Sequence, residues 1–111
     1  MKIEEQILMK NWIASHNEIG LILPDGWFGR PNDNILKFVA FQMDADKLRI
    51  ELEEQLLLSF VGNLQISEEE DGRNLAIGKF TECIFKRKEF GSNIFREKKY
   101  VEGVVRFVST D

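Results

Sequence analysis

Residues 48–60, LRIELEEQLLLSF, carry the clearest pattern in the chain, because apolar side chains occupy every even-numbered position except 54. Side chains two residues apart lie on the same face of a strand, so this alternation predicts β structure. One long strand would satisfy the same alternation, but strands of that length are uncommon. We therefore predict a hairpin with Glu53-Glu54-Gln55 as its loop, in which Leu52 faces Leu56, Ile50 faces Leu58 and Leu48 faces Phe60.

The N-terminal segment has a different period. Apolar residues at steps of four and five place one side of a helix at Ile3, Ile7, Leu8, Trp12 and Ile13. Asn17 and Gly20 are stop signals that end this helix.

The rest of the chain reads as short strands with turn-forming residues between them. These segments lie at 19–23, 35–43, 64–66, 75–86, 94–100 and 104–108. The apolar residues of 35–43 fall on both parities, which indicates a strand covered on both faces or strongly twisted. The connections are short enough for antiparallel hairpins. We predict an α+β fold: a mainly antiparallel, strongly curved β-sheet, or a small sandwich or half-barrel, of about seven strands with one N-terminal helix.

Length and composition predict one globular domain over residues 1–111. The chain is 43% hydrophobic and contains nine phenylalanines, which is enough to form a core without disulfides. Its single cysteine, Cys83, cannot form an internal disulfide, and the charged N-terminus does not resemble a signal peptide. No apolar stretch approaches the roughly 20 residues that span a bilayer. We therefore expect a cytoplasmic protein that does not insert into membranes.

The net charge of −4 is unevenly distributed. Residues 44–71, the acidic segment, contain nine acids and two bases, a net charge of −7. Residues 86–106, the basic segment, contain seven bases and three acids, a net charge of +4. Such a split can steer a charged partner, but two solvated faces that pair with each other would give the same pattern.

The sequence offers few residues for catalysis, so we expect a protein that is not an enzyme. The only histidine, His16, falls near the end of the predicted helix, where a C-terminal cation or a surface residue is expected. Cys83 lies in an apolar segment and reads as a core residue. One Cys and one His cannot form a structural zinc site, and the carboxylate clusters lack calcium-loop spacing. We predict no catalytic residues, no metal and no cofactor.

Residues 22–34, ILPDGWFGRPNDN, form the one stretch that reads as a specialised loop. Leu23-Pro24-Asp25-Gly26 fits a tight turn, and Gly29 offers a positive φ angle before a proline. In one interpretation the aromatic pair covers an open end of the sheet while the arginine pairs with a neighbouring acid. In the other, the loop projects outward and binds a partner. The candidate binding residues are Asp25, Trp27, Phe28, Arg30, Asp33 and Asn34.

The run from Leu23 to Pro31, followed by Asp33-Asn34, resembles the LPDGWFGRPxDN signature of a family of small uncharacterised bacterial proteins. A looser similarity continues through Lys47-Leu48, Glu53-Glu54-Gln55-Leu56 and Val105-Arg106-Phe107. Position 32 is asparagine here and more often aromatic in that family, which puts a shared contact there in doubt. The resemblance implies a bacterial, cytoplasmic origin and no particular activity.

Two function hypotheses follow from these features. The first is a non-catalytic protein-binding module, of the immunity or inhibitor type, whose acidic segment covers a basic surface of another protein. The alternative is a small-ligand binding protein, or an unusual enzyme, with a pocket between the Trp27–Arg30 loop and the basic residues 86–88 and Arg96. Nucleic-acid binding through the basic segment is a weaker third idea, because the overall charge is negative. The oligomeric state stays open.

Overall fold

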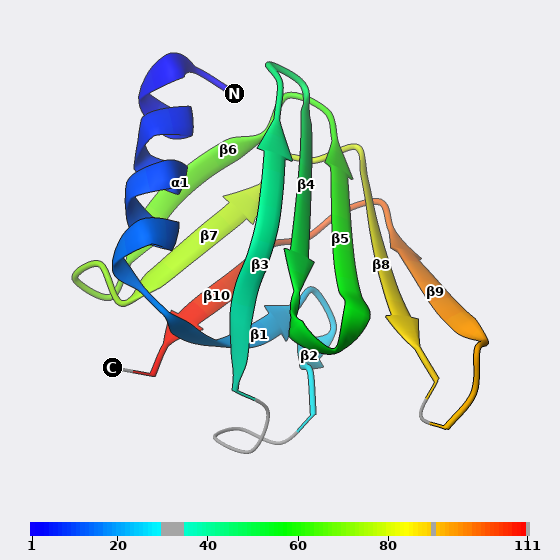
Figure 1. Cartoon of the computed structure of the whole chain (residues 1–111). Coiled ribbons are helices and arrows are strands. Elements are labelled where there is room, and N and C mark those ends of the chain that lie inside the picture. Colours follow the sequence, from blue (N-terminus) through cyan, green and yellow to red (C-terminus); the bar gives the residue numbers. More distant parts are fainter. Residues whose placement is uncertain (30–34, 90, 111) are drawn as a thin grey trace.

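The structure of the protein is a computed structural model that describes residues 1–29, 35–89 and 91–110. These described residues form one α-helix, one 3₁₀ turn and ten strands (Figure 1). In chain order they are α1 (Ile3–Ser15), β1 (Glu18–Leu23), β2 (Gly26–Trp27), β3 (Leu36–Met43), β4 (Lys47–Leu52), η1 (Glu53–Gln55), β5 (Leu56–Val61), β6 (Gln65–Glu69), β7 (Asn74–Gly78), β8 (Glu82–Lys88), β9 (Phe95–Tyr100) and β10 (Val105–Ser109).

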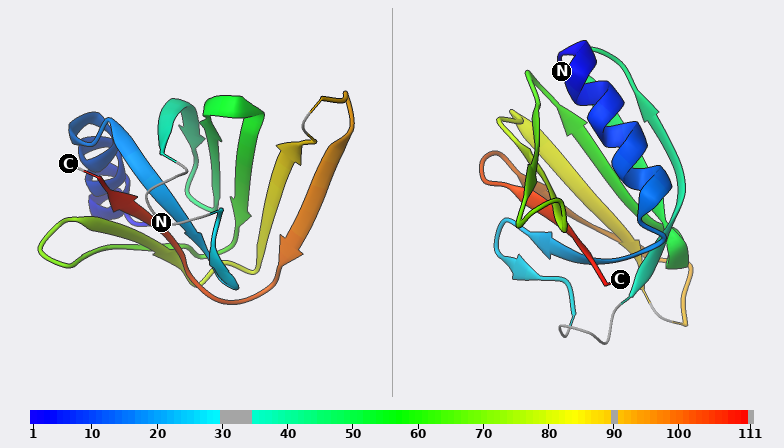
Figure 2. Two further views of the ribbon diagram at one scale, coloured as in Figure 1. Left: turned by 90° about the horizontal axis from the view of Figure 1, so that it is seen from below. Right: turned by 90° about the vertical axis from the view of Figure 1, so that its left-hand side faces the viewer.

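All paired strands are antiparallel and belong to one open sheet in the order β6-β7-β10-β1-β3-β4-β5-β8-β9, with β2 paired to β1. The sheet folds into a trough, with β6, β7, β10 and β1 in one half and the other strands in the second half (Figure 2). The halves are joined by two residue pairs of β1 and β3, Glu18 with Lys37 and Ile19 with Leu36. The α+β class, the helix and the antiparallel sheet are therefore confirmed, whereas the count of about seven strands was too low and the sheet does not close.

The β4–β5 hairpin has the predicted register. Leu52 pairs with Leu56, Ile50 with Leu58 and Leu48 with Phe60, and all six side chains are buried. The residues between them form η1, in which Glu54 and Gln55 have φ angles of 64° and 60°. This turn connects the two strands so that their even-numbered apolar side chains face into the trough.

Two strands go beyond the eight strand segments read from the sequence, and they have separate causes. The segment 75–86 divides into β7 and β8, because Lys79 takes a positive φ of 61° and reverses the chain. Lysine is not a typical turn former, so the available signal of this break was Gly78, the last residue of β7. The second addition is the two-residue strand β2, which lies within the predicted loop and pairs with Ile22 and Leu23.

The mixed parity of β3 comes from a bulge. The register between β3 and β4 shifts between Phe38 and Ala40, and Val39 is exposed there. Leu36 and Phe38 face the core before the bulge, and odd-numbered side chains face it afterwards. An extra residue in one strand reverses the faces of all that follow. The expectation of a strand covered on both faces was therefore wrong.

The helix lies between β6 and β3, as Figures 1 and 2 show. The predicted face is confirmed at Leu8, Trp12 and Ile13, which are buried or pack against the core, but not at its N-terminal end. Ile3 and Ile7 are 71% and 52% exposed, whereas Met9 and Trp12 are buried. The Trp12 indole N–H donates to the Gly72 carbonyl at 2.9 Å, and its ring meets Phe38 edge-on at 6.4 Å. Contacts with both halves of the sheet therefore decide which side of the helix is buried.

The last two strands do not pair with each other. β9 pairs with β8 at one edge of the sheet, while β10 lies between β7 and β1. The connection between them passes close to the β1–β2 turn: a Cβ at Gly103, whose φ is 111°, would lie 2.7 Å from the Pro24 Cβ. A glycine is needed there for both reasons. The connection between these two strands is short enough for a hairpin but does not form one.

Candidate functional site

The candidate site begins with residues 23–29, here called the Trp27 loop. Leu23 pairs with Gly26 and Ile22 with Trp27, so Pro24 and Asp25 form the tip of a two-residue turn. Gly29 has the positive φ that the sequence predicted, 72°. Arg30, Asp33 and Asn34, the other candidate binding residues, lie outside the described part of the chain.

Asp25 fastens this turn to the edge strand β9. It accepts a hydrogen bond from the Tyr100 hydroxyl at 2.9 Å and pairs with the Lys98 ammonium group. The bonds from Lys98 and then Tyr100 lower the pKa of Asp25 below its usual value. Burial, and then the bond to Asp25, raise the pKa of Tyr100.

The two aromatic residues of the loop have different environments. Phe28 is half-buried, packs against Phe85 with ring centroids 5.4 Å apart, and donates its backbone N–H to the Leu21 carbonyl at 2.9 Å. Trp27 stays 43% exposed and covers Gly20, where an added Cβ would lie 3.0 Å from the indole ring. Phe28 therefore caps the core, whereas much of Trp27 faces solvent.

Three cations face the Trp27 loop from β8 and β9. Directly paired residues lie on one face of a sheet. Cys83 and Phe85 are buried in the trough, so Arg87, two residues further along β8, lies on the same inner face. Arg96 pairs with Arg87 and Lys98 pairs with Phe85, so both share that face. Arg87, Arg96 and Lys98 are called the cleft cations below.

A cleft of about 650 Å³ lies between the Trp27 loop and these strands. Its charged walls include the cleft cations together with Asp25 and Glu97, and its aromatic walls are Trp27, Phe28, Phe85 and Tyr100. We call it the basic cleft. The sequence predicted a pocket between the Trp27–Arg30 loop, residues 86–88 and Arg96; of the three residues 86–88, only Arg87 lines this cleft.

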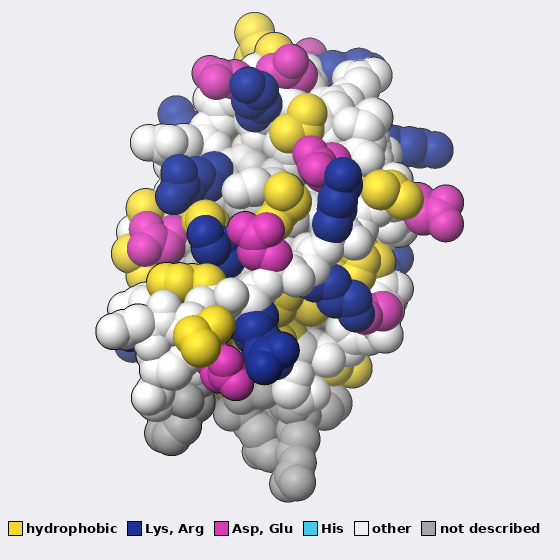
Figure 3. Space-filling model, turned by 90° about the vertical axis from the view of Figure 1, so that its right-hand side faces the viewer, with side chains coloured by type: hydrophobic (Ala, Val, Ile, Leu, Met, Phe, Trp, Pro, Cys, Tyr) yellow, Lys and Arg dark blue, Asp and Glu magenta, His cyan; other side chains and the backbone are white. Residues whose placement is uncertain are grey.

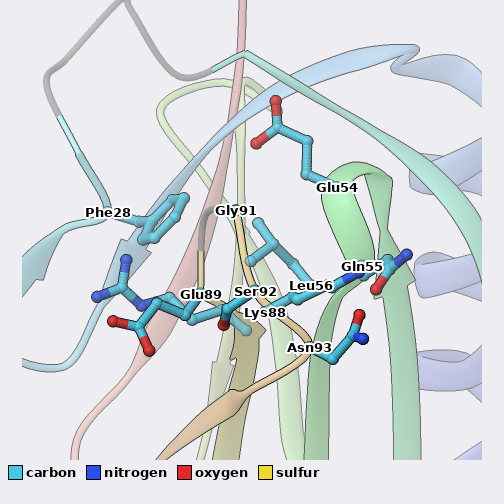
Figure 4. A pocket seen from close by; sticks show the side chains of 10 residues that line it. Phe28, Glu54, Gln55, Leu56, Lys88, Glu89, Gly91, Ser92 and Asn93 are labelled. Atoms are coloured by element: carbon cyan, nitrogen blue, oxygen red, sulfur yellow. The ribbon is translucent and has the colours of Figure 1, made fainter.

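A second cavity of about 670 Å³ lies beside Phe28 and also reaches Arg87 (Figure 4). Its other walls come from η1, with Glu54 and Gln55, and from the β8–β9 turn, with Gly91 and Ser92. The close-up shows the Phe28 ring at the margin of this cavity. Phe28 and Arg87 are thus shared by both cavities.

The cleft cations are unequally neutralised. Arg96 pairs with Glu89 at 3.3 Å, and Lys98 pairs with Asp25. Arg87 has no hydrogen-bond or ion-pair partner among the residues that the structure describes. Like charges directly opposite each other destabilise a sheet. The Arg87–Arg96 pair is therefore an electrostatic cost to the folded chain that an anion would relieve.

Lys98 and Tyr100 were absent from the predicted binding residues. The available signal was that Arg96, Lys98 and Tyr100 lie two residues apart and so share one face of the strand. The tyrosine in this row suits a position between core and solvent. The sequence did not show that this parity is the inner one, because that depends on the register of β9 against β8.

The histidine and the cysteine both lie outside the cleft. His16 ends α1, with its ring stacked on Trp12 at 4.1 Å and its Nδ1 2.9 Å from the Trp12 carbonyl. Burial raises the pKa of Cys83 to about 12, which makes its thiol unreactive, as expected of a core residue. In the described part of the chain, no three His, Cys, Asp or Glu side chains are grouped to hold a metal ion.

The acidic segment does not present one face. Asp44 and Asp46 flank the β3–β4 turn, whereas Glu53 and Glu54 lie at the other end of β4. A six-residue strand spans about 20 Å. Residues 68–71 lie at the β6–β7 turn, in the other half of the sheet (Figure 1).

Comparison with protein-family models, with curated proteins and with solved structures finds no match for this chain. The similarity to the LPDGWFGRPxDN signature is therefore untested. The described residues include no helix with the length and apolar character that crossing a bilayer requires.

Proposed function

We propose that the protein is a non-catalytic binding protein whose basic cleft takes a small anionic molecule with an aromatic or apolar body. The observation that carries this proposal is Arg87: it lies directly opposite Arg96 on the inner face of the sheet and has no anionic partner among the described residues. Guanidinium groups bind carboxylates and phosphates through paired hydrogen bonds. A ligand of this chemistry would neutralise the cations that the fold places together.

Size and lining support the same ligand class. The cleft of about 650 Å³ falls within the ~300–1,000 Å³ that is typical of small-molecule sites. Trp27 is the half-exposed aromatic wall on which a flat apolar body would stack. Asp25, held by Lys98 and Tyr100, keeps the loop in position against β9.

The tryptophans provide a direct assay. Trp12 is buried in the helix interface and Trp27 lines the cleft, so a cleft ligand should change the emission of Trp27 alone. Benzoate and phenyl phosphate are the anionic probes, and benzyl alcohol is the neutral one. We expect binding of at least one anion, with an affinity that falls as salt rises, and no response in Trp27→Phe.

The matched variants are Arg87→Gln and Lys99→Gln. Arg87 lies in the cleft, whereas Lys99 lies on the outer face of the same hairpin, paired with Glu82. Loss of one charge-assisted contact should weaken anion binding roughly tenfold or more in Arg87→Gln and leave it unchanged in Lys99→Gln. Equal binding of benzyl alcohol, or no response to either anion, would contradict the proposal.

A protein partner, the first hypothesis from the sequence, also remains a proposal. The acids of the acidic segment are divided among separate turns, which does not favour them as one contact surface. The exposed edge of the sheet at β9 is the better candidate surface for such a partner.

A further inference from the structure

One edge of the sheet is covered by the helix, and the other edge is exposed. α1 packs along β6, and the Glu5 carboxylate accepts a hydrogen bond of 2.6 Å from the Ile66 backbone N–H. At the other edge, no strand or helix of the described chain lies beyond β9, and residues 95–99 are all exposed. An exposed edge strand is a template on which another strand can pair.

The backbone groups that face outward can be assigned. Glu89 N–H donates to the Ile94 carbonyl at 2.8 Å, and this pair continues the β8–β9 register. Hydrogen-bonded pairs alternate along an antiparallel ladder, so Arg96 and Lys98 also bond to β8. Phe95, Glu97 and Lys99 therefore direct their N–H and C=O groups away from the sheet.

The β4–β5 and β5–β8 ladders lead to the same assignment of the β9 backbone groups. Gly62 N–H donates to the Asp46 carbonyl at 3.0 Å, in line with the β4–β5 register. The same alternation then makes β5 bond to β8 through Leu57 and Ser59, opposite Lys86 and Ile84. The backbone N–H and C=O groups of the odd-numbered β8 residues are therefore the ones that bond to β9. This is the same assignment that the Glu89–Ile94 hydrogen bond gives.

The edge is basic and partly apolar. Residues 82–100 contain six bases and three acids in a chain whose overall charge is −4. Phe95 is 46% exposed on the outer face, with the Lys86 ammonium 5.2 Å from its ring centre. Figure 3 views this side of the molecule, where Lys and Arg side chains are interspersed with acidic and hydrophobic ones.

We propose that β9 is a docking edge for an extended acidic segment of another protein, which joins the sheet as an additional strand. Backbone bonds to residues 95, 97 and 99 would hold the segment, and the acidic side chains on its inner face would lie beside Arg96 and Lys98. A second copy of this chain is disfavoured, because β9 against β9 would bring two basic strands together. The proposal does not depend on a ligand in the basic cleft.

The test uses a labelled synthetic peptide of alternating Val and Glu, with its Val-Lys counterpart, and fluorescence polarisation. Glu97→Pro removes one outward N–H without removing a bond to β8, and Glu97→Gln is the matched control that keeps the N–H. We expect binding of the acidic peptide only, a loss of about tenfold or more in Glu97→Pro, and no loss in Glu97→Gln.

Two further arms keep the result decisive. If Glu97→Pro does not fold, peptides N-methylated at alternate residues test the same hydrogen bonds on the unaltered protein, and one of the two methylation patterns should abolish binding. Arg87→Gln should still bind the acidic peptide, which separates this edge from the basic cleft. The proposal would be overturned if the acidic peptide did not bind, or if the Val-Lys peptide bound equally well. Acidic-peptide binding that is unchanged in Glu97→Pro, or unchanged for both methylated peptides, would also overturn it. So would a dimer that forms through β9.

Discussion

The inner face of the sheet changes character between the β4–β5 hairpin and the β8–β9 hairpin. One row of paired residues runs Ile50, Leu58, Phe85, Lys98, so the same face begins with buried aliphatic side chains and ends with an exposed cation. The first hairpin is covered by the other half of the trough, and the second extends past it (Figure 2). Position along the sheet, more than local sequence, therefore decides whether an inward side chain serves stability or binding.

Leu58→Ala should give the largest effect, because it removes a fully buried side chain from the β4–β5 end of that row. We expect the free energy of unfolding to fall by about 2–5 kcal/mol. Chemical denaturation measures this change. The matched control is Leu57→Ala on the opposite, partly exposed face, where the loss should be less than half as large. Equal losses at the two positions would mean that the faces are not distinct.

A fall in pH should weaken the attachment of the Trp27 loop to β9. The resulting loss of stability should be smaller than that caused by Leu58→Ala. The pKa of Asp25 is lowered by Lys98 and then Tyr100, so its contribution is present above the ordinary value of 3.8 and is lost as pH falls through the lower, folded value. Melting temperatures measured below about pH 4 should decline more steeply in the parent protein than in Asp25→Asn.

The pKa of Glu5 is also lowered, which makes the Asn variant the necessary control. Burial raises the pKa of Glu5, but hydrogen bonds from the Lys2 and Ile66 backbones outweigh it, so the net shift is downward. Its contribution is also lost in acid and persists in Asp25→Asn. Identical pH profiles for the two proteins would show that Asp25 does not hold the loop.

Arg87→Leu should have the smallest effect on stability. It places an apolar side chain on the inner face of β8, two residues beyond Phe85, and removes the like-charge pair with Arg96, so the free energy of unfolding should change by no more than about 0.5 kcal/mol. The same variant should lose anion binding. A loss of stability as large as that of Leu58→Ala would place Arg87 in the core and remove the contrast between the hairpins.

The fold was predictable where local patterns are complete. The alternation of 48–60 predicted a hairpin and its register, because only one pairing buries all six apolar side chains. The trough itself was not predictable in this way, since β10 pairs with β1 and β7 across long sequence separations. Likewise, the bulge at Val39 involves a residue with no bulge preference, and the break at Lys79 was marked by a single neighbouring glycine.

The candidate site was predictable in location and less so in detail. Clustering of bases and a rigid aromatic loop indicated the two sides of the cleft. The contact of Asp25 with Lys98 and Tyr100 joins residues more than 70 positions apart, which no spacing in the sequence announces. The predicted face of the helix was correct at its C-terminal end and wrong at Ile3 and Ile7. The buried side is set by the contacts of Trp12 with both halves of the sheet, which the helix sequence does not contain.

The central place of β10 has a consequence for synthesis and folding. The chain visits the two halves of the trough alternately, and the β6–β7 hairpin joins the remaining strands only through β10. A nascent polypeptide that stops short of residue 105 can form isolated hairpins but lacks the strand that unites them. Folding should therefore finish late, in a single cooperative step, at the slow rates of milliseconds to seconds typical of non-local β topologies.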